Sequence, residues 1–195
     1  MTDQRQFLDR FAHSRAAQWA AFAWGLAEAT LFFIVPDVLL TAIACRSLRA
    51  GLKASCVAVA GALLGGILMY GAGHAAPQTA RAWLVRLPAI HPPLIQHVQM
   101  QLASHGLGAV LLGPALGIPY KIYAVEWGVG HGNELMFLVV SIPARGVRFV
   151  LSAVVANGIA RLIAPWTRRR APIETTILAL FWIGFYALYL AHFGW

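Results

Sequence analysis

Charged residues are scarce in this sequence. Asp, Glu, Lys and Arg make up 11% of the 195 residues, whereas an ordinary soluble domain carries roughly a quarter. So few charges cannot cover the surface of a soluble domain of this size. The 59% of hydrophobic residues and the mean hydropathy of +0.68 also exclude a disordered chain. The composition therefore predicts an integral membrane protein with a single domain.

Cysteine is nearly absent, and the familiar catalytic motifs are missing. Cys45 and Cys56 are too few for a disulfide framework or a metal cluster, so we interpret them as structural. His91, His97 and His105 follow no ligand spacing, which favours interfacial histidines over a metal site. The sequence contains no serine elbow, zinc signature or P-loop. Because nothing in it supplies an activated nucleophile, we expect no enzyme, no catalytic residue and no cofactor.

The basic residues lie in short tracts between apolar runs. The formal net charge is +8, but the tracts lack a fold that presents them to nucleic acid, so we expect no nucleic-acid partner. Membrane topology produces this pattern through the positive-inside bias. Asp3 and Asp9 stand among the first arginines, so we expect no cleavable signal peptide. We predict a cytoplasmic segment at residues 1–15 and one membrane domain at 16–195.

Five apolar stretches follow one another along the chain, at about residues 16–45, 54–73, 106–127, 135–163 and 173–193. The second, fourth and fifth are long enough to span a bilayer at ~1.5 Å per residue. The first breaks at Pro36-Asp37, and the piece beyond reaches only about 12 Å, too short to cross. It is either one long kinked helix or a re-entrant hairpin. The third stretch is rich in glycine and proline, and we interpret it in the same way, as an interrupted segment rather than a plain spanning helix.

The distribution of basic residues favours a re-entrant hairpin over one long spanning helix in the first stretch. With two hairpins, one side of the membrane holds ten basic residues: Arg5, Arg10, Arg15, Arg46, Arg49, Lys53, Arg161, Arg168, Arg169 and Arg170. The other side holds Arg81 and Arg86, so the first group is expected in the cytoplasm. We therefore predict an all-α integral membrane protein with three spanning helices plus two opposed re-entrant helical hairpins. The segment from Pro77 to Ser104 lies outside the membrane core and includes an interfacial helix after Pro92-Pro93.

Six ionisable residues lie within or at the edge of the apolar stretches: Glu28, Asp37, Lys121, Glu126, Arg145 and Arg148. A charge at the bilayer centre costs from about 2.5 kcal/mol upward, so each needs a partner, water or a function. The equal number of acids and bases favours mutual pairing. For Lys121 and Glu126, snorkelling to an interface is an equal alternative.

We expect four of these charges to form one polar site inside the membrane. A break at Pro36 lets the carboxylates of Glu28 and Asp37 turn toward a common cavity. Arg145 and Arg148 are three residues apart and share a helix face. Such a site suits an anionic headgroup or a coupled proton, or it holds the fold together.

Three segments together resemble a known family. The first is Glu28-Ala-Thr-Leu-Phe-Phe-Ile-Val-Pro36-Asp37, in which an acid precedes a proline and a second acid. The second is the glycine-rich run from Gly61 through Gly65-Gly66 to Tyr70-Gly71, and the third runs from His105 to Gly128 with Gly113 and Ile118-Pro119-Tyr120-Lys121. In order and spacing they resemble the DedA family, also called the VTT or SNARE-associated Golgi protein family, most closely its short YqaA-like branch. The resemblance covers about residues 18–160 and leaves 173–193 as an extra spanning helix.

The resemblance implies a multi-pass protein of the cell inner membrane whose partners are membrane lipids and protons. It implies movement or scrambling of an anionic lipid of the phospholipid or undecaprenyl-phosphate class. Transport members carry arginines on the second hairpin, where this chain has Pro114 after a glycine and, further on, Lys121. Arg145 and Arg148 are then candidates for that role.

The expected substrate-binding or proton-coupling residues are Glu28, Asp37, Lys121, Arg145 and Arg148. The alternative is a non-transporting interaction or envelope-integrity protein in which these charges are structural. The sequence leaves the lipid, the coupling ion and a homo-oligomeric state open.

Overall fold

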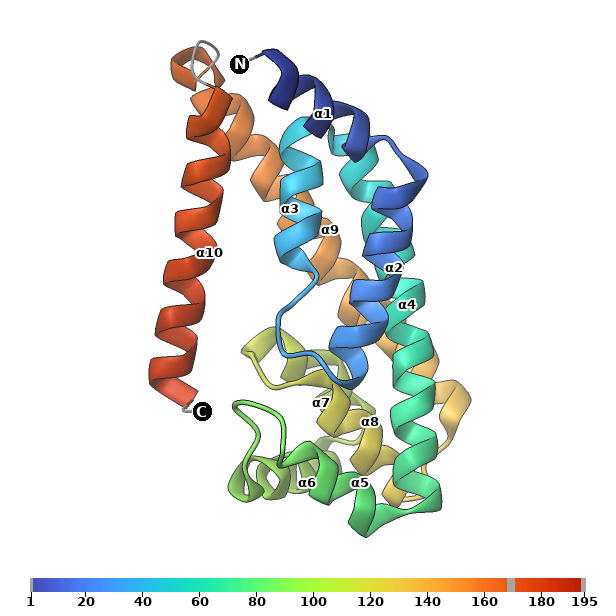
Figure 1. Cartoon of the computed structure of the whole chain (residues 1–195). Coiled ribbons are helices and arrows are strands. Elements are labelled where there is room, and N and C mark those ends of the chain that lie inside the picture. The colour runs from blue at the N-terminus through green and yellow to red at the C-terminus, as the bar shows by residue number, and fades with distance from the viewer. Residues whose placement is uncertain (1, 168–170, 194–195) are drawn as a thin grey trace.

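The computed structural model describes residues 2–167 and 171–193, and the side chains of residues 6–164 and 175–191. The described residues form helices and the turns between them, with no strand (Figure 1). In chain order the elements are α1 (Thr2–Ala12), α2 (Arg15–Thr30), α3 (Asp37–Arg46), α4 (Leu48–Ala75), α5 (Pro77–Leu84), α6 (Pro92–His105), α7 (Leu107–Leu112), the 3-10 turn η1 (Gly113–Leu116), α8 (Tyr120–Val129), α9 (Glu134–Thr167) and α10 (Ala171–Phe193). The predicted all-helical architecture is confirmed for this part of the chain.

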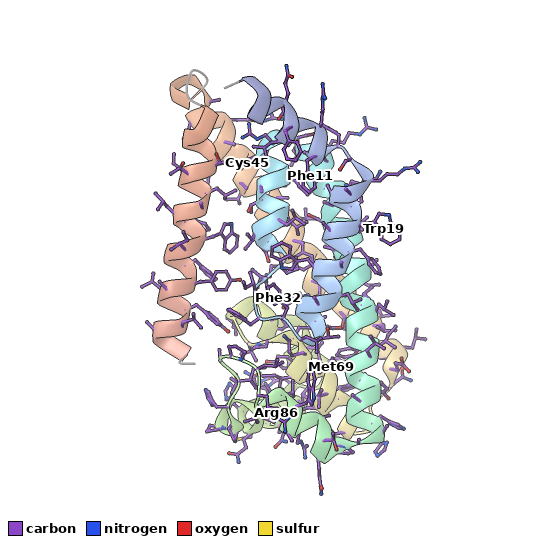
Figure 2. The ribbon with its side chains drawn as sticks, in the orientation of Figure 1. Phe11, Trp19, Phe32, Cys45, Met69 and Arg86 are labelled. Atoms are coloured by element: carbon purple, nitrogen blue, oxygen red, sulfur yellow. The ribbon has the colours of Figure 1, made fainter. Side chains whose placement is uncertain are left out.

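Two of the described helices, α4 and α9, are long and apolar enough to cross a membrane. Their most apolar windows have mean hydropathies of 1.9 and 1.7. The third predicted span falls in α10, where Thr175–Ala191 forms a shorter apolar helix. Trp19 projects outward from α2 (Figure 2) and is 70% exposed. Such an apolar exterior is compatible with a helical membrane protein.

Close packing of α2 against α4 depends on glycine. A Cβ atom on Gly25 would lie 2.2 Å from the carbonyl oxygen of Ala58, and one on Gly61 would lie 2.1 Å from that of Phe22. Small residues let helix backbones approach this closely in membrane proteins, where packing rather than hydrophobic burial drives association. The glycine-rich sequence of α4 therefore sets the distance between these two helices.

The chain reverses between α2 and α3, and both outer ends of this helix pair lie at the α1 end of the molecule (Figure 1). Pro36 caps α3, but α2 already ends at Thr30, so the break is wider than the predicted Pro36-Asp37 step. Three side chains bind the backbone of the loop 31–36. Trp24 donates to the carbonyl of Ile34 at 2.9 Å and Lys121 to that of Phe32 at 2.7 Å, while the hydroxyl of Tyr186 accepts from the Val35 amide at 2.7 Å.

A second interruption separates α7 from α8. The turn η1 is followed by Gly117, whose φ of 92° is readily available only to glycine. At the start of α7, Gly106 joins this helix directly to α6 and has a φ of 53°. Helices α5 and α6 lie at the end of the molecule away from α1. The helix pair α7–α8 therefore enters the molecule from that end, opposite to the end from which the pair α2–α3 enters (Figure 1).

The segment between α4 and α7 holds two helices rather than the single interfacial helix predicted. The predicted one is α6, and its apolar Ile95 and Val98 are buried. The other is α5, whose Leu84 is fully buried. Helix α5 was not predicted, because its eight residues are too few to display a clear hydrophobic period.

Candidate functional site

A cavity of about 490 Å³ lies between α9, α10, the two loop tips and the loop that joins α5 to α6. It is lined by the five residues expected to form the site: Glu28, Asp37, Lys121, Arg145 and Arg148. They come from α2, α3, α8 and α9, so the fold brings together residues more than 100 positions apart. Phe32, at the tip of the first loop, lies midway along the molecule (Figure 2).

Arg145 is fully buried and pairs with Glu28. Its Nη2 donates a hydrogen bond to Oε2 of the carboxylate. The guanidinium lies 5.2 Å from the ring centroid of Tyr120 and 4.8 Å from that of Phe149, within the range of cation–π attraction. Its Nε and Nη1 atoms have no hydrogen-bond partner among the described residues. The site therefore holds a buried cation with two donor nitrogens that have no acceptor among the described residues.

Arg148 is the more accessible arginine, with 25% of its side chain exposed. Its Nη2 donates to Oδ2 of Asp37 at 2.6 Å, and the Ser152 hydroxyl donates to Oδ1 at 2.6 Å. Asp37 is the first residue of α3, where the positive end of the helix dipole stabilises a carboxylate. Glu28 of α2 and Asp37 of α3 thus bond different arginines on one face of α9.

Lys121 forms no ion pair among the described residues, and its side chain is buried. It is 2% exposed, and its bond to the Phe32 carbonyl ties α8 to the loop of the first pair. Next to it, the Tyr120 hydroxyl donates to Ser141 of α9 at 2.8 Å. The lysine is therefore both a cation at the cavity and a link between the two interrupted segments.

Glu126 lies outside the cavity and forms a separate cluster. Its carboxylate accepts hydrogen bonds from Nε and Nη2 of Arg81 at 2.8 and 2.6 Å and from Gln99 at 2.9 Å. These bonds and the carboxylate charge raise the pKa of Arg81 against the opposing effect of burial. The cluster attaches α5 and α6 to α8. This cluster was not predicted, because its only signal in the sequence is an acid in an apolar stretch that needs a partner.

One wall of the cavity is aromatic and comes from α10, through Trp182, Phe185, Tyr186 and Tyr189. Trp182 donates to the hydroxyl of Thr41 at 3.1 Å. From the sequence this segment was predicted only as a membrane span, although its aromatic residues recur at helical spacing and so share one face of the helix.

The cavity combines a positive charge with apolar walls. Three cations and two carboxylates line it, which leaves a formal charge of +1. The remaining lining is largely apolar or aromatic, including Phe33, Val35 and the segment 114–119. This arrangement suits a small anionic group attached to an apolar body, because charge-assisted hydrogen bonds strengthen where water is scarce.

Comparison with family models, curated proteins and solved structures gives no match to this chain. The resemblance to the DedA family therefore stays a prediction from the order and spacing of its motifs.

Proposed function

We propose that this chain is a membrane protein of the DedA type that binds the anionic headgroup of a lipid in the central cavity and moves the lipid between leaflets. The observation that carries the proposal is the cavity of about 490 Å³, with an excess positive charge, amid apolar helices. Ionisable residues in such surroundings are costly and mark ligand or ion pathways in membrane proteins.

In this proposal α4, α9 and α10 span the inner membrane, and the pairs α2–α3 and α7–α8 form re-entrant hairpins from opposite sides. The α1 end faces the cytoplasm, in keeping with the excess of basic residues. A loop such as 31–36 is tolerated at membrane depth only when its backbone groups have partners. The bonds to Trp24, Lys121 and Tyr186 supply partners for three of these backbone groups.

Arg148 provides the first contact with a phosphate. It is the partly exposed cation of the cavity, and its planar guanidinium can bind two phosphate oxygens at once. A bound phosphate then competes with Asp37 for Arg148, and the released carboxylate becomes free to take up a proton. In this way, headgroup binding and proton uptake share one pair of residues.

The test of headgroup binding is native mass spectrometry of the purified protein with phosphatidylglycerol and with zwitterionic phosphatidylcholine. We expect retention of the anionic lipid and a loss of roughly tenfold in its affinity in Arg148→Ala, since a hydrogen bond to a charged group contributes about 1.5–3 kcal/mol. Arg161→Ala is the matched control, because Arg161 lies on the same helix and is exposed. Equal retention of both lipids, or no effect of Arg148→Ala, contradicts the proposal.

The alternative is a non-transporting interaction protein whose buried charges only hold the helices together. The observation in its favour is that Glu28 and Asp37 each already bond an arginine. It predicts that substitutions at the cavity reduce function only in proportion to the loss of folded protein.

A further inference from the structure

Two histidines from different elements meet at the end of the molecule away from α1. His74 lies in the last turn of α4, and His131 lies in the turn between α8 and α9. Their Nδ1 atoms are 3.1 Å apart, and the rings stand at 81° with centroids 4.5 Å apart. His74 and His131 are both exposed. Two neighbouring imidazole nitrogens with access to solvent are therefore available to a ligand.

The backbone of His131 holds its side chain in place. Its φ is 51°, and among the described residues only Ala89 is another non-glycine with positive φ. Hydrogen bonds fix this turn, from His131 N to the Gly128 carbonyl and from Gly132 N to the Trp127 carbonyl, both at 3.0 Å. An uncommon conformation of this kind persists only where the surroundings impose it, and it often occurs at functional sites.

Tyr70 connects the two histidines. Its hydroxyl donates to the Gly132 carbonyl at 2.7 Å, next to His131, and its ring stacks on that of His74 at 6.0 Å. The backbones also touch here, since a Cβ atom on Gly128 would lie 2.2 Å from the Tyr70 carbonyl oxygen. Both rings are therefore mounted on rigidly packed elements, so the short distance between them is a feature of the fold.

We propose that His74 and His131 bind one divalent transition-metal ion of the Zn²⁺ class through their Nδ1 atoms. Zn–N bonds of about 2.0–2.1 Å in tetrahedral geometry place two nitrogens roughly 3.3 Å apart. The observed 3.1 Å is close to this separation, and the rings must turn so that both lone pairs point at the metal rather than along the line between the nitrogens. The described residues contain no group of three or more His, Cys, Asp or Glu side chains suited to a metal. Water therefore completes the coordination, and the site is an open one.

The protons balance without a change in the charge of either ring. In the hydrogen-bonded pair, one Nδ1 carries the proton and the other accepts it. Metal binding moves that proton through solvent to Nε2 of the same ring, which leaves a lone pair on both Nδ1 atoms. An exposed hydrogen bond between two imidazoles has little net strength of its own and does not account for the imposed backbone at His131.

The test is a titration of the purified protein, prepared without a histidine tag, with Zn²⁺ by calorimetry in detergent. We expect one saturable Zn²⁺ per chain and a rise in the unfolding temperature on binding. His74→Gln and His131→Asn should each weaken binding by roughly tenfold or more, since even the loss of a group that only orients a ligand costs about 10- to 100-fold. Asparagine suits the positive φ at position 131 and preserves the fold.

His105→Gln is the matched control. His105 is exposed on α6, and its Nδ1 lies near the hydroxyl of its neighbour Ser104 rather than another histidine. This variant should bind Zn²⁺ as the unmodified protein does. The proposal is overturned if no saturable binding is seen, or if His74→Gln and His131→Asn, with unchanged unfolding temperatures in the absence of metal, bind Zn²⁺ as tightly as the unmodified chain.

Discussion

Among single residues, Arg145 has the most demanding surroundings. Its guanidinium is fully buried, and Glu28 is the acid that neutralises it. Removing two charges from water costs several kcal/mol per ion, and mutual attraction repays this only while both partners are present. The contribution of either residue to stability therefore depends on the other, both in a lipid-binding site and in a structural contact between α2 and α9.

A double-mutant cycle measures this pair. Glu28→Ala should lower the free energy of unfolding by about 3–5 kcal/mol, because it leaves the arginine charged and unpaired in low dielectric. Glu28→Ala combined with Arg145→Ala should recover part of that loss, with a coupling energy of about 0.5–3 kcal/mol. Denaturant unfolding in detergent gives all three values. Arg161→Ala should change stability by less than about 0.5 kcal/mol, and strictly additive effects of Glu28→Ala and Arg145→Ala would refute the coupling.

The sequence predicted that these acids and arginines meet, but not which acid bonds which arginine. Spacing shows that Arg145 and Arg148 share a face of α9, and it says nothing about which end of the first pair each one reaches. Lys121 shows the same limit. Its partner is the carbonyl of Phe32. Every residue carries a backbone carbonyl, so the sequence does not indicate which one a lysine will bind.

At the level of elements, glycine decides how closely α2 and α4 approach. Gly61→Ala places a methyl group against the carbonyl of Phe22 and should cost about 1–3 kcal/mol of stability, as overpacking does. Gly71 lies on the same helix, and a Cβ atom there would have no neighbour within 4 Å. Gly71→Ala should therefore be neutral or stabilise by up to about 1 kcal/mol, because alanine favours the helix.

Thermal unfolding in detergent compares these two variants directly. The packing account predicts a lower midpoint for Gly61→Ala and an equal or higher midpoint for Gly71→Ala. Equal midpoints for both would show that helix propensity, not contact with α2, governs position 61.

The positions of the apolar helices could be read from the sequence, whereas their ends could not. Hydropathy located α4, α9 and α10 to within a few residues at most ends, although α4 begins six residues before the predicted stretch. The first break proved wider than its proline suggested. Trp24 and Tyr186, far apart in the chain, bind the backbone of that loop and so stabilise non-helical residues that are themselves apolar. Such tertiary contacts override local preference.

At the scale of the whole molecule, the membrane topology is still a prediction. The structure places the outer ends of α2 and α3 at one end of the molecule, and α5 and α6 at the other (Figure 1). Arg168, Arg169 and Arg170, which contribute to the predicted excess of cytoplasmic basic residues, lie outside the described residues, as does Trp195, which is predicted to lie on the opposite side. Topology is therefore best tested at positions 10, 49 and 99.

Single cysteines at these positions, in a chain without Cys45 and Cys56, can be labelled in intact cells with an impermeant reagent. We expect Arg10→Cys and Arg49→Cys to be protected inside the cell and Gln99→Cys to react, because the basic end faces the cytoplasm. Labelling of positions 10 and 49 from opposite sides would mean that α2 and α3 cross the membrane as one span.

The central claim concerns movement of an anionic lipid through the charged cavity. The most direct measurement is the rate at which labelled phosphatidylglycerol changes leaflet in vesicles containing the purified protein. Arg148→Ala is the preferred variant, since Asp37 keeps the hydrogen bond from Ser152 when Arg148 is removed, whereas Arg145→Ala leaves the buried Glu28 without its bonded partner. Asp37→Asn, compared at several pH values, reports on proton coupling, because Asp37 is the carboxylate that a phosphate releases from Arg148. Arg161→Ala is the control.

The account predicts rapid exchange in the unmodified protein and exchange at least ~10-fold slower in Arg148→Ala, the effect expected from losing a charged hydrogen bond. It also predicts an unchanged rate in Arg161→Ala and a loss of pH dependence in Asp37→Asn. A folded, membrane-inserted Arg148→Ala variant that moves the lipid at the unmodified rate would contradict it.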